Sequence, residues 1–174
     1  PMDLEGCSAL VWGGASGFGE ASGRRLGVLG GGPVIADLNE EKGKALAEDL
    51  NGTFVKTDVS DPDQAQAAVE AAQQLGPLRA AVNAAGLGNA NRTVSRDGKP
   101  FPLDQFEFVI RVNLIGTFNC LRLAAAAMSQ QDPCDAEGQR GSIVNIASVA
   151  AFDGQIGQAA YSASKGGVVG MTLP

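Results

Sequence analysis

Short apolar runs alternate along the chain with longer segments in which apolar residues recur every three or four positions. The short runs predict five buried strands, at residues 7–12, 33–38, 53–59, 78–86 and 142–148. The longer segments predict helices over 18–29, 39–50, 60–74, 103–129 and from 159 to the end. Such alternation is typical of parallel strands joined by right-handed crossovers. The pattern therefore predicts an α/β fold, a doubly wound parallel sheet in three layers, as a single domain over residues 1–174.

Charge and composition narrow the classes of partner. The formal net charge is −6, from 13 basic and 19 acidic residues, and no basic stripe suits the phosphates of a nucleic acid. We find no apolar run long enough to cross a bilayer and no targeting segment, so we expect no membrane partner. Three widely spaced cysteines favour neither a disulfide framework nor a metal site, which fits a cytoplasmic protein.

The amino acids that are absent restrict the possible chemistry. The chain has no histidine, which excludes Ser-His-Asp and Cys-His catalysis and zinc sites with imidazole ligands. It has one tyrosine, Tyr161. A proton transfer near neutral pH must therefore use a carboxylate, a lysine, a cysteine or this tyrosine.

A glycine-rich turn joins the first predicted strand to the first predicted helix. In it, Gly13 permits a sharp exit from the strand, Gly17 lets the backbone approach a pyrophosphate, and Gly19 lets helix and sheet pack closely. The helix start, with Ser16 and Phe18, offers free amide groups to phosphates. The motif alone is also compatible with a purely structural turn. As a functional site, it predicts dinucleotide binding in a Rossmann-like fold.

An acid at the end of the second strand supports the dinucleotide interpretation. Asp37 follows Gly17 by about 20 residues, where a carboxylate can accept hydrogen bonds from the adenosine ribose. A carboxylate there would repel a 2′-phosphate, and no arginine follows in residues 38–40 to attract one. We therefore expect NAD rather than NADP as the cofactor.

Two further strands end in residues that we expect at the cofactor edge of the sheet. Asp58 and Val59 close the third strand, whereas Asn83, Ala84 and Gly86 close the fourth. Open α/β sheets bind ligands beyond the carboxyl ends of their strands. Each of these residues could also be an ordinary turn residue.

The last predicted helix carries a candidate acid–base pair. Tyr161 and Lys165 lie at i and i+4, on one helix face, where the ammonium favours the phenolate form of the tyrosine. Ser148 ends the fifth strand at the same edge, where it can hydrogen-bond a substrate carbonyl oxygen. Asn113, inside a long helix, is a candidate for holding a water, although a surface asparagine is equally compatible with its position.

Taken in order, these motifs resemble those of the short-chain dehydrogenase/reductase family. The matching positions are residues 12–19, Asp37, Asp58, Val59, residues 83–86, Asn113, Ser148 and residues 161–165. The resemblance implies a nicotinamide-dependent oxidoreductase for alcohol/carbonyl pairs. It implies that Tyr161 exchanges the proton, Ser148 orients the substrate oxygen, Lys165 holds the nicotinamide ribose, and Asn113 supports a water-linked relay.

Residues 147–174 are similar to type 2 3-hydroxyacyl-CoA dehydrogenases, also called 17β-hydroxysteroid dehydrogenases type 10. This similarity implies a small-molecule substrate, an acyl-CoA or another hydroxy/keto compound, with Gln155 in its pocket. The resemblance also implies a full-length homo-oligomer, a tetramer or dimer. Family members continue with two more strands, so we expect a fold truncated after the fifth strand and its following helix.

The single tryptophan, Trp12, stands where the family usually has threonine. We expect its indole to pack under the glycine turn or against the first helix, in the space left by Gly23 and Gly27. Two functional interpretations remain open. One is an NAD-dependent dehydrogenase, and the other is a non-catalytic NAD-binding module or an inactive fragment of such an enzyme.

Overall fold

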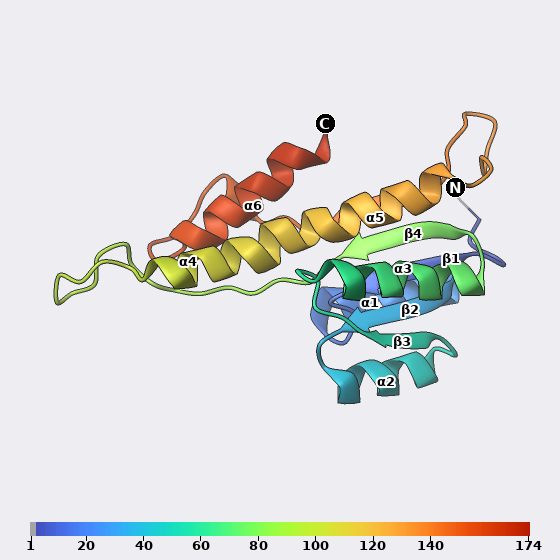
Figure 1. Ribbon diagram of the computed structural model, residues 1–174, viewed down its shortest axis with the longest axis horizontal. Coiled ribbons are helices and arrows are strands. Elements are labelled where there is room, and N and C mark those ends of the chain that lie inside the picture. Colours follow the sequence, from blue (N-terminus) through green and yellow to red (C-terminus); the bar gives the residue numbers. More distant parts are fainter. Residues whose placement is uncertain (1–2) are drawn as a thin grey trace.

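The computed structural model describes residues 3–174 and confirms the expected doubly wound sheet (Figure 1). All strand pairs are parallel, in the order β3-β2-β1-β4-β5. The strands are β1 (Ser8–Trp12), β2 (Gly32–Asp37), β3 (Thr53–Lys56), β4 (Leu78–Asn83) and β5 (Ser142–Asn145). The last three end three residues earlier than the apolar runs predict.

The helices lie where the periodicity predicts them. They are α1 (Gly17–Val28), α2 (Glu40–Asp49), α3 (Pro62–Leu75), α4 (Leu103–Ile110), α5 (Thr117–Ser129) and α6 (Ala159–Thr172), with a π-helical turn η1 (Arg111–Gly116) and a short 3₁₀ turn η2 (Val149–Ala151). Local capping fixes two starts: Asn39 accepts from Lys42 N before α2, and Asp61 accepts from Asp63 N and Gln64 N before α3.

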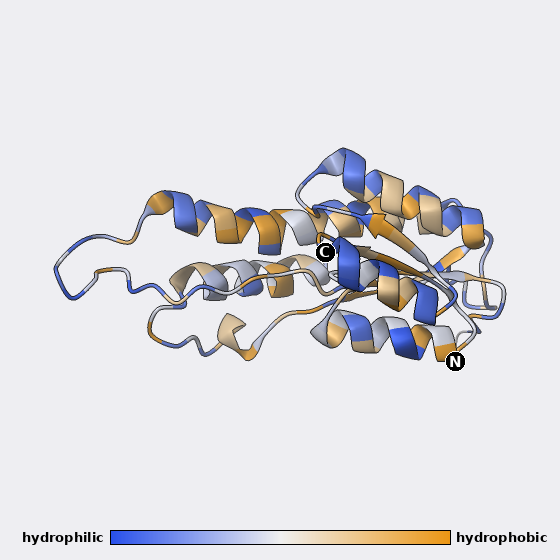
Figure 2. Cartoon of the chain, turned by 90° about the horizontal axis from the view of Figure 1, so that it is seen from below, coloured by the Kyte–Doolittle hydropathy of each residue, from blue (hydrophilic) through white to orange (hydrophobic). Residues whose placement is uncertain are grey.

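The helices form two layers around the sheet. Helices α1 and α2 pack on one face, whereas α3 and α5 pack on the other. Helix α6 lies beside α4 and η1, and together they extend away from the sheet (Figure 1). Figure 2 shows mainly apolar strands between helices that carry both apolar and polar residues. The strand order reverses between β1 and β4, which creates a crevice at their carboxyl ends.

Trp12 lies on the face of the sheet away from α1, so its indole does not pack against the first helix, one of the two places we expected. Side chains alternate along a strand, so Leu10 and Trp12 share one face, and both belong to the core beneath α3 and α5. Gly23 instead packs over Ile35, and a Cβ there would lie 2.9 Å from Ile35 Cδ1. The expectation that the indole uses the space at Gly23 and Gly27 was therefore wrong.

Helices α4, η1 and α5 form one continuous helix of 27 residues, Leu103–Ser129. By length and apolar composition alone it could cross a membrane, which corrects our statement that no such run exists. Core helices of soluble proteins pass the same test. Here Cys120, Ala124 and Met128 are buried in the core between α5 and the sheet.

Replacing Trp12 tests what its large side chain contributes. It is fully buried, and its Nε1 has no hydrogen-bond partner among the described residues. We expect Trp12→Ala to lower the free energy of unfolding by about 3–5 kcal/mol. Trp12→Phe should cost clearly less, because most of the ring volume stays and an unpaired N–H disappears. Equal losses in urea unfolding of the two variants would contradict this account.

Candidate functional site

The glycine turn is shaped by close backbone contacts at the carboxyl end of β1. Gly13 has φ +71°, and a Cβ there would lie 2.5 Å from the Ala85 backbone after β4. A Cβ at Gly19 would lie 2.0 Å from the Gly13 carbonyl oxygen, so this glycine fits the turn itself rather than the sheet. Gly17 has φ +54°, and nothing lies within 4 Å of its Cβ position. Of the three, only Gly17 borders open space on its Cβ side.

The start of α1 presents unused backbone donors beside that open space. Ser16 is the N-cap, and its side chain makes no capping hydrogen bond. Glu20 N donates to Ser16 O, but within residues 3–174 the amides of Gly17, Phe18 and Gly19 have no protein acceptor. A helix N-terminus with free amides and a positive dipole end suits an anionic group such as a phosphate.

Asp37, at the end of β2, braces the same turn. Its Oδ2 accepts from Ala15 N at 2.9 Å, and its Oδ1 accepts from Asn39 N at 2.8 Å. A carboxylate has room for further donors on both oxygens. Asp37 therefore shapes the glycine turn and still offers acceptor positions to a ligand.

These groups line one cavity of about 480 Å³, here called the nucleotide cavity after the cofactor that the sequence leads us to expect. It contains most of the expected cofactor residues: Gly13, Ser16, Gly17, Phe18, Gly19, Asp37, Asp58, Val59, Ala84 and Gly86. Asn83 does not line it. Its buried amide donates from Nδ2 to Asn145 Oδ1 at 2.8 Å and joins β4 to β5 instead.

Several residues that line the nucleotide cavity were not predicted from the sequence. Thr57 and Ser60 flank the expected Asp58, and their place directly after β3 was the available signal. Leu38 follows Asp37 in the same way. Phe108 and Val112, at i and i+4 of the long helix, approach from far along the chain and carried no local signal.

The expected catalytic residues Ser148, Tyr161 and Lys165 line a second cavity of about 750 Å³, here called the catalytic cavity. Phe18, Ala84, Gly86 and Leu87 line both cavities, so the two are contiguous. The structure therefore brings the expected acid–base pair and the glycine turn to the same crevice.

Within the catalytic cavity, Lys165 and Ser148 are each fixed by one contact. Lys165 Nζ donates to Ile146 O at 2.7 Å and lies 5.8 Å from the centroid of the Tyr161 ring. Burial lowers the pKa of the Lys165 amine below its ordinary value. Ser148 Oγ accepts from Ala150 N at 3.1 Å, so the hydroxyl proton of Ser148 remains available to a ligand.

Asn113 lies in the π-helical turn, fully buried, and lines neither cavity. Its Oδ1 accepts from Leu87 N at 2.8 Å, and its Nδ2 donates to Leu87 O at 2.8 Å and to Ser164 Oγ at 3.1 Å. Both amide hydrogens are thus used. The side chain fixes the chain just after Gly86, whose Cβ position lies 3.3 Å from Asn113 Oδ1 and 3.6 Å from Lys165 Nζ.

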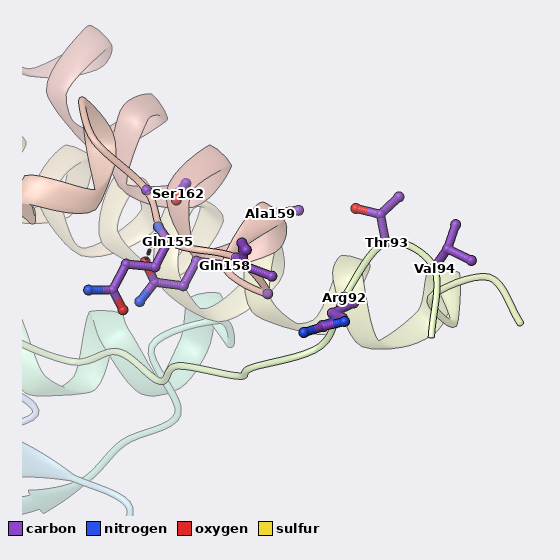
Figure 3. A pocket seen from close by; sticks show the side chains of 10 residues that line it. Arg92, Thr93, Val94, Gln155, Gln158, Ala159 and Ser162 are labelled. Atoms are coloured by element: carbon purple, nitrogen blue, oxygen red, sulfur yellow. Dashed lines mark hydrogen bonds between the residues drawn. The ribbon is translucent and has the colours of Figure 1, made fainter. Parts of the chain in front are cut away.

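Gln155 lies outside the catalytic cavity, in a neighbouring cavity of about 620 Å³ (Figure 3). Arg92, from the segment after β4, lines the same cavity. Gln158 lines both this cavity and the catalytic one, and its Oε1 accepts from Gln155 N at 2.9 Å. Gln158 is therefore a substrate-side candidate that the sequence reasoning missed, although it precedes Tyr161 by three positions.

Comparison with known proteins agrees with this geometry. A family model described as short chain dehydrogenase matches residues 8–173. The 3-hydroxyacyl-CoA dehydrogenase type-2 of Bos taurus is 48% identical over 98% of this chain and 67% of its own length. A crystal structure of 3-hydroxyacyl-CoA dehydrogenase type-2 from Mycobacterium avium matches with a TM-score of 0.93 and 50% identity, covering 97% of this chain and 67% of that one.

A third relative is the 2-dehydro-3-deoxy-L-rhamnonate dehydrogenase (NAD(+)) of a Sphingomonas species, 38% identical over 96% of this chain and 64% of its own length. The chain thus spans about two thirds of the length of these relatives. The family match covers both the glycine turn and the tyrosine helix. This chain belongs to the short chain dehydrogenase family, and it is an oxidoreductase of that family.

Proposed function

We propose that the protein transfers a hydride between NAD and an alcohol/carbonyl substrate, with Tyr161 as the acid–base group. The observation that carries this proposal is the contiguity of the two cavities. Tyr161, Lys165 and Ser148 line one, and the glycine turn with Asp37 lines the other. A hydride transfer needs a dinucleotide and a proton-transfer group next to each other, and two contiguous cavities support this arrangement.

The residues of the nucleotide cavity fit NAD. The free amides at Gly17–Gly19 suit the pyrophosphate, and the missing side chain at Gly17 leaves it room. Asp37 suits the hydroxyls of the adenosine ribose and opposes a 2′-phosphate. Asp58 Oδ1 accepts from Ser60, which leaves Oδ2 as an acceptor for the amino group of adenine.

When bound, NAD supplies the acceptor for the hydride that leaves the substrate carbon. In this direction the Tyr161 phenolate oxygen takes the proton of the substrate hydroxyl. Lys165 places its ammonium group near the ring, 5.8 Å from the ring centroid. Ser148 keeps its proton and donates a hydrogen bond from its hydroxyl to the substrate oxygen, which orients the substrate. In the reverse direction Tyr161 returns the proton to the carbonyl oxygen.

The names of the relatives guide the choice of substrate. Two of the proteins reported above are 3-hydroxyacyl-CoA dehydrogenases, so we propose a 3-hydroxyacyl-CoA as the first substrate to test. The rhamnonate relative acts on a sugar acid by its name, which makes hydroxy acids the second class to test. NAD binding without turnover of either class would favour the non-catalytic module.

Removing the Tyr161 hydroxyl tests the mechanism. We expect Tyr161→Phe to lower kcat by about 10²–10⁴-fold, because the proton-transfer group is lost. NAD affinity should change little, since the nucleotide cavity is untouched. Ser129→Ala, which removes a hydroxyl from the far end of α5, is the matched control and should retain full activity. Comparable NADH formation by Tyr161→Phe and the unaltered protein would rule this mechanism out.

Alanine at two neighbouring glycines separates ligand binding from folding. Gly17→Ala should cost about 1–2 kcal/mol from its left-handed backbone, and it should weaken NAD binding because the new methyl enters the cavity. Gly19→Ala should lower the free energy of unfolding more, because its Cβ would collide with the Gly13 carbonyl. Urea unfolding and calorimetric titration with NAD measure both effects. A Gly17→Ala protein with undiminished NAD affinity would argue against the pyrophosphate placement.

Two substitutions of Asp37 separate the effect of its hydrogen bond to Ala15 N from the effect of its negative charge. Asp37→Ala leaves the buried Ala15 amide without its acceptor, so we expect a loss of about 1–3 kcal/mol in unfolding free energy. Asp37→Asn keeps one side-chain oxygen and should lose less stability. Both variants should bind NADP better relative to NAD, because the repulsion of the 2′-phosphate disappears. An unchanged NAD/NADP affinity ratio would contradict the assignment.

A further inference from the structure

The turn between β3 and α3, Thr57–Asp61, supplies several walls of the nucleotide cavity. Thr57, Asp58, Val59 and Ser60 all line it. Ser60 donates to Asp58 Oδ1 from both its amide and its hydroxyl, each at 2.8 Å. These contacts hold the Asp58 carboxylate relative to the turn, so anything that fixes the turn also fixes Oδ2.

A buried side-chain amide on α5 donates hydrogen bonds to this turn. Asn119 is 5% exposed, and its Nδ2 donates to Val59 O at 2.9 Å and to Asp61 O at 3.4 Å. The two carbonyls flank Ser60. Asn119 itself lines none of the cavities described above. Its contacts reach a ligand only through the turn.

Arg122, one helical turn further along α5, settles the orientation of that amide. Its Nε and Nη2 donate to Asn119 Oδ1 at 3.1 and 2.7 Å. A guanidinium can only donate, so the atom that faces it must be the amide oxygen. The Nδ2 donor of Asn119 is then directed at the two turn carbonyls, where an oxygen would be repelled.

The same stretch of helix approaches the turn closely one turn earlier. A Cβ at Gly116 would lie 2.6 Å from Val59 Cγ2, so glycine is needed for Val59 to pack there. Val59 is 7% exposed. The turn is thus fixed by a packing contact at Gly116 and by hydrogen bonds at Asn119.

We propose that Asn119, oriented by Arg122, is a positioning residue that fixes the Asp58–Val59 turn and thereby gives the nucleotide cavity its preference for a purine with an exocyclic amino group. The base preference rests on the proposed NAD function. The fixing of the turn does not, because all the contacts lie within the protein.

Hydrogen exchange of the ligand-free protein tests the positioning directly. The amides of Ser60 and Asp61 both donate to Asp58, so they exchange only when the turn opens. We expect Asn119→Ala and Asn119→Asp to speed their exchange by about tenfold or more, since the aspartate sets an oxygen against two carbonyls. Arg122→Met should have the same effect in weaker form.

The matched control is Cys120→Ala, the next residue along α5. Its thiol is fully buried in the same core cluster as Val59 but makes no hydrogen bond to the turn, so the variant loses packing and keeps every hydrogen bond that holds the turn. We expect Cys120→Ala to lower the melting temperature without selective exposure of Ser60 and Asp61. If these two amides exchange as slowly in the Asn119 variants as in Cys120→Ala, the positioning role is overturned.

Base preference is measured with NAD and with nicotinamide hypoxanthine dinucleotide, which carries a carbonyl oxygen in place of the amino group. We expect the unaltered protein and Cys120→Ala to bind NAD about tenfold more tightly than this analogue. The ratio should fall toward one in the Asn119 variants. If the Asn119 variants show faster exchange at the turn but keep the same ratio of the two affinities, only the base preference is overturned. Failure of the unaltered protein to bind NAD overturns the proposed function, and hydrogen exchange still decides the positioning.

Discussion

The site depends on how closely two chain segments meet at the carboxyl ends of β1 and β4. Gly13 packs directly against the Ala84–Ala85 backbone, with no room for a side chain between them. This contact sets the glycine turn on one side and the Gly86 segment on the other. The nucleotide cavity and the catalytic cavity both include Ala84 and Gly86, so both take their shape from the same junction.

The long helix Leu103–Ser129 connects the two halves of the site. Its π-helical turn places Asn113 against Leu87, next to the catalytic cavity. One and two turns later, Gly116 and Asn119 contact the turn after β3, at the nucleotide cavity. The extra residue of a π-helical turn changes which side chains face each neighbour, and such turns are frequent at functional sites. A single element therefore aligns segments that are far apart in sequence.

Local patterns predicted much of this architecture. Strand alternation and glycine spacing indicated the sheet and the turn, and the i, i+4 spacing placed Tyr161 and Lys165 on one helix face. The prediction that Trp12 packs against α1 was wrong, because the glycines of α1 suggested a free space that the Ile35 side chain fills. Asn83 was expected at the cofactor, but its side chain bonds Asn145, its partner in the register of the neighbouring strand β5, which the local sequence does not reveal. The Asn119 contacts join segments about 60 residues apart, and no local spacing reveals such a pair.

The position of the single tryptophan has a spectroscopic consequence. Trp12 is the last residue of β1 and directly precedes Gly13, the first residue of the turn that faces the nucleotide cavity. Its indole is shielded from water and donates to no described acceptor. Tryptophan emission, excited where Tyr161 does not absorb, therefore reports one environment, the core directly before the glycine turn. The protein carries its own optical probe in the core, one residue before the glycine turn, and no label has to be introduced.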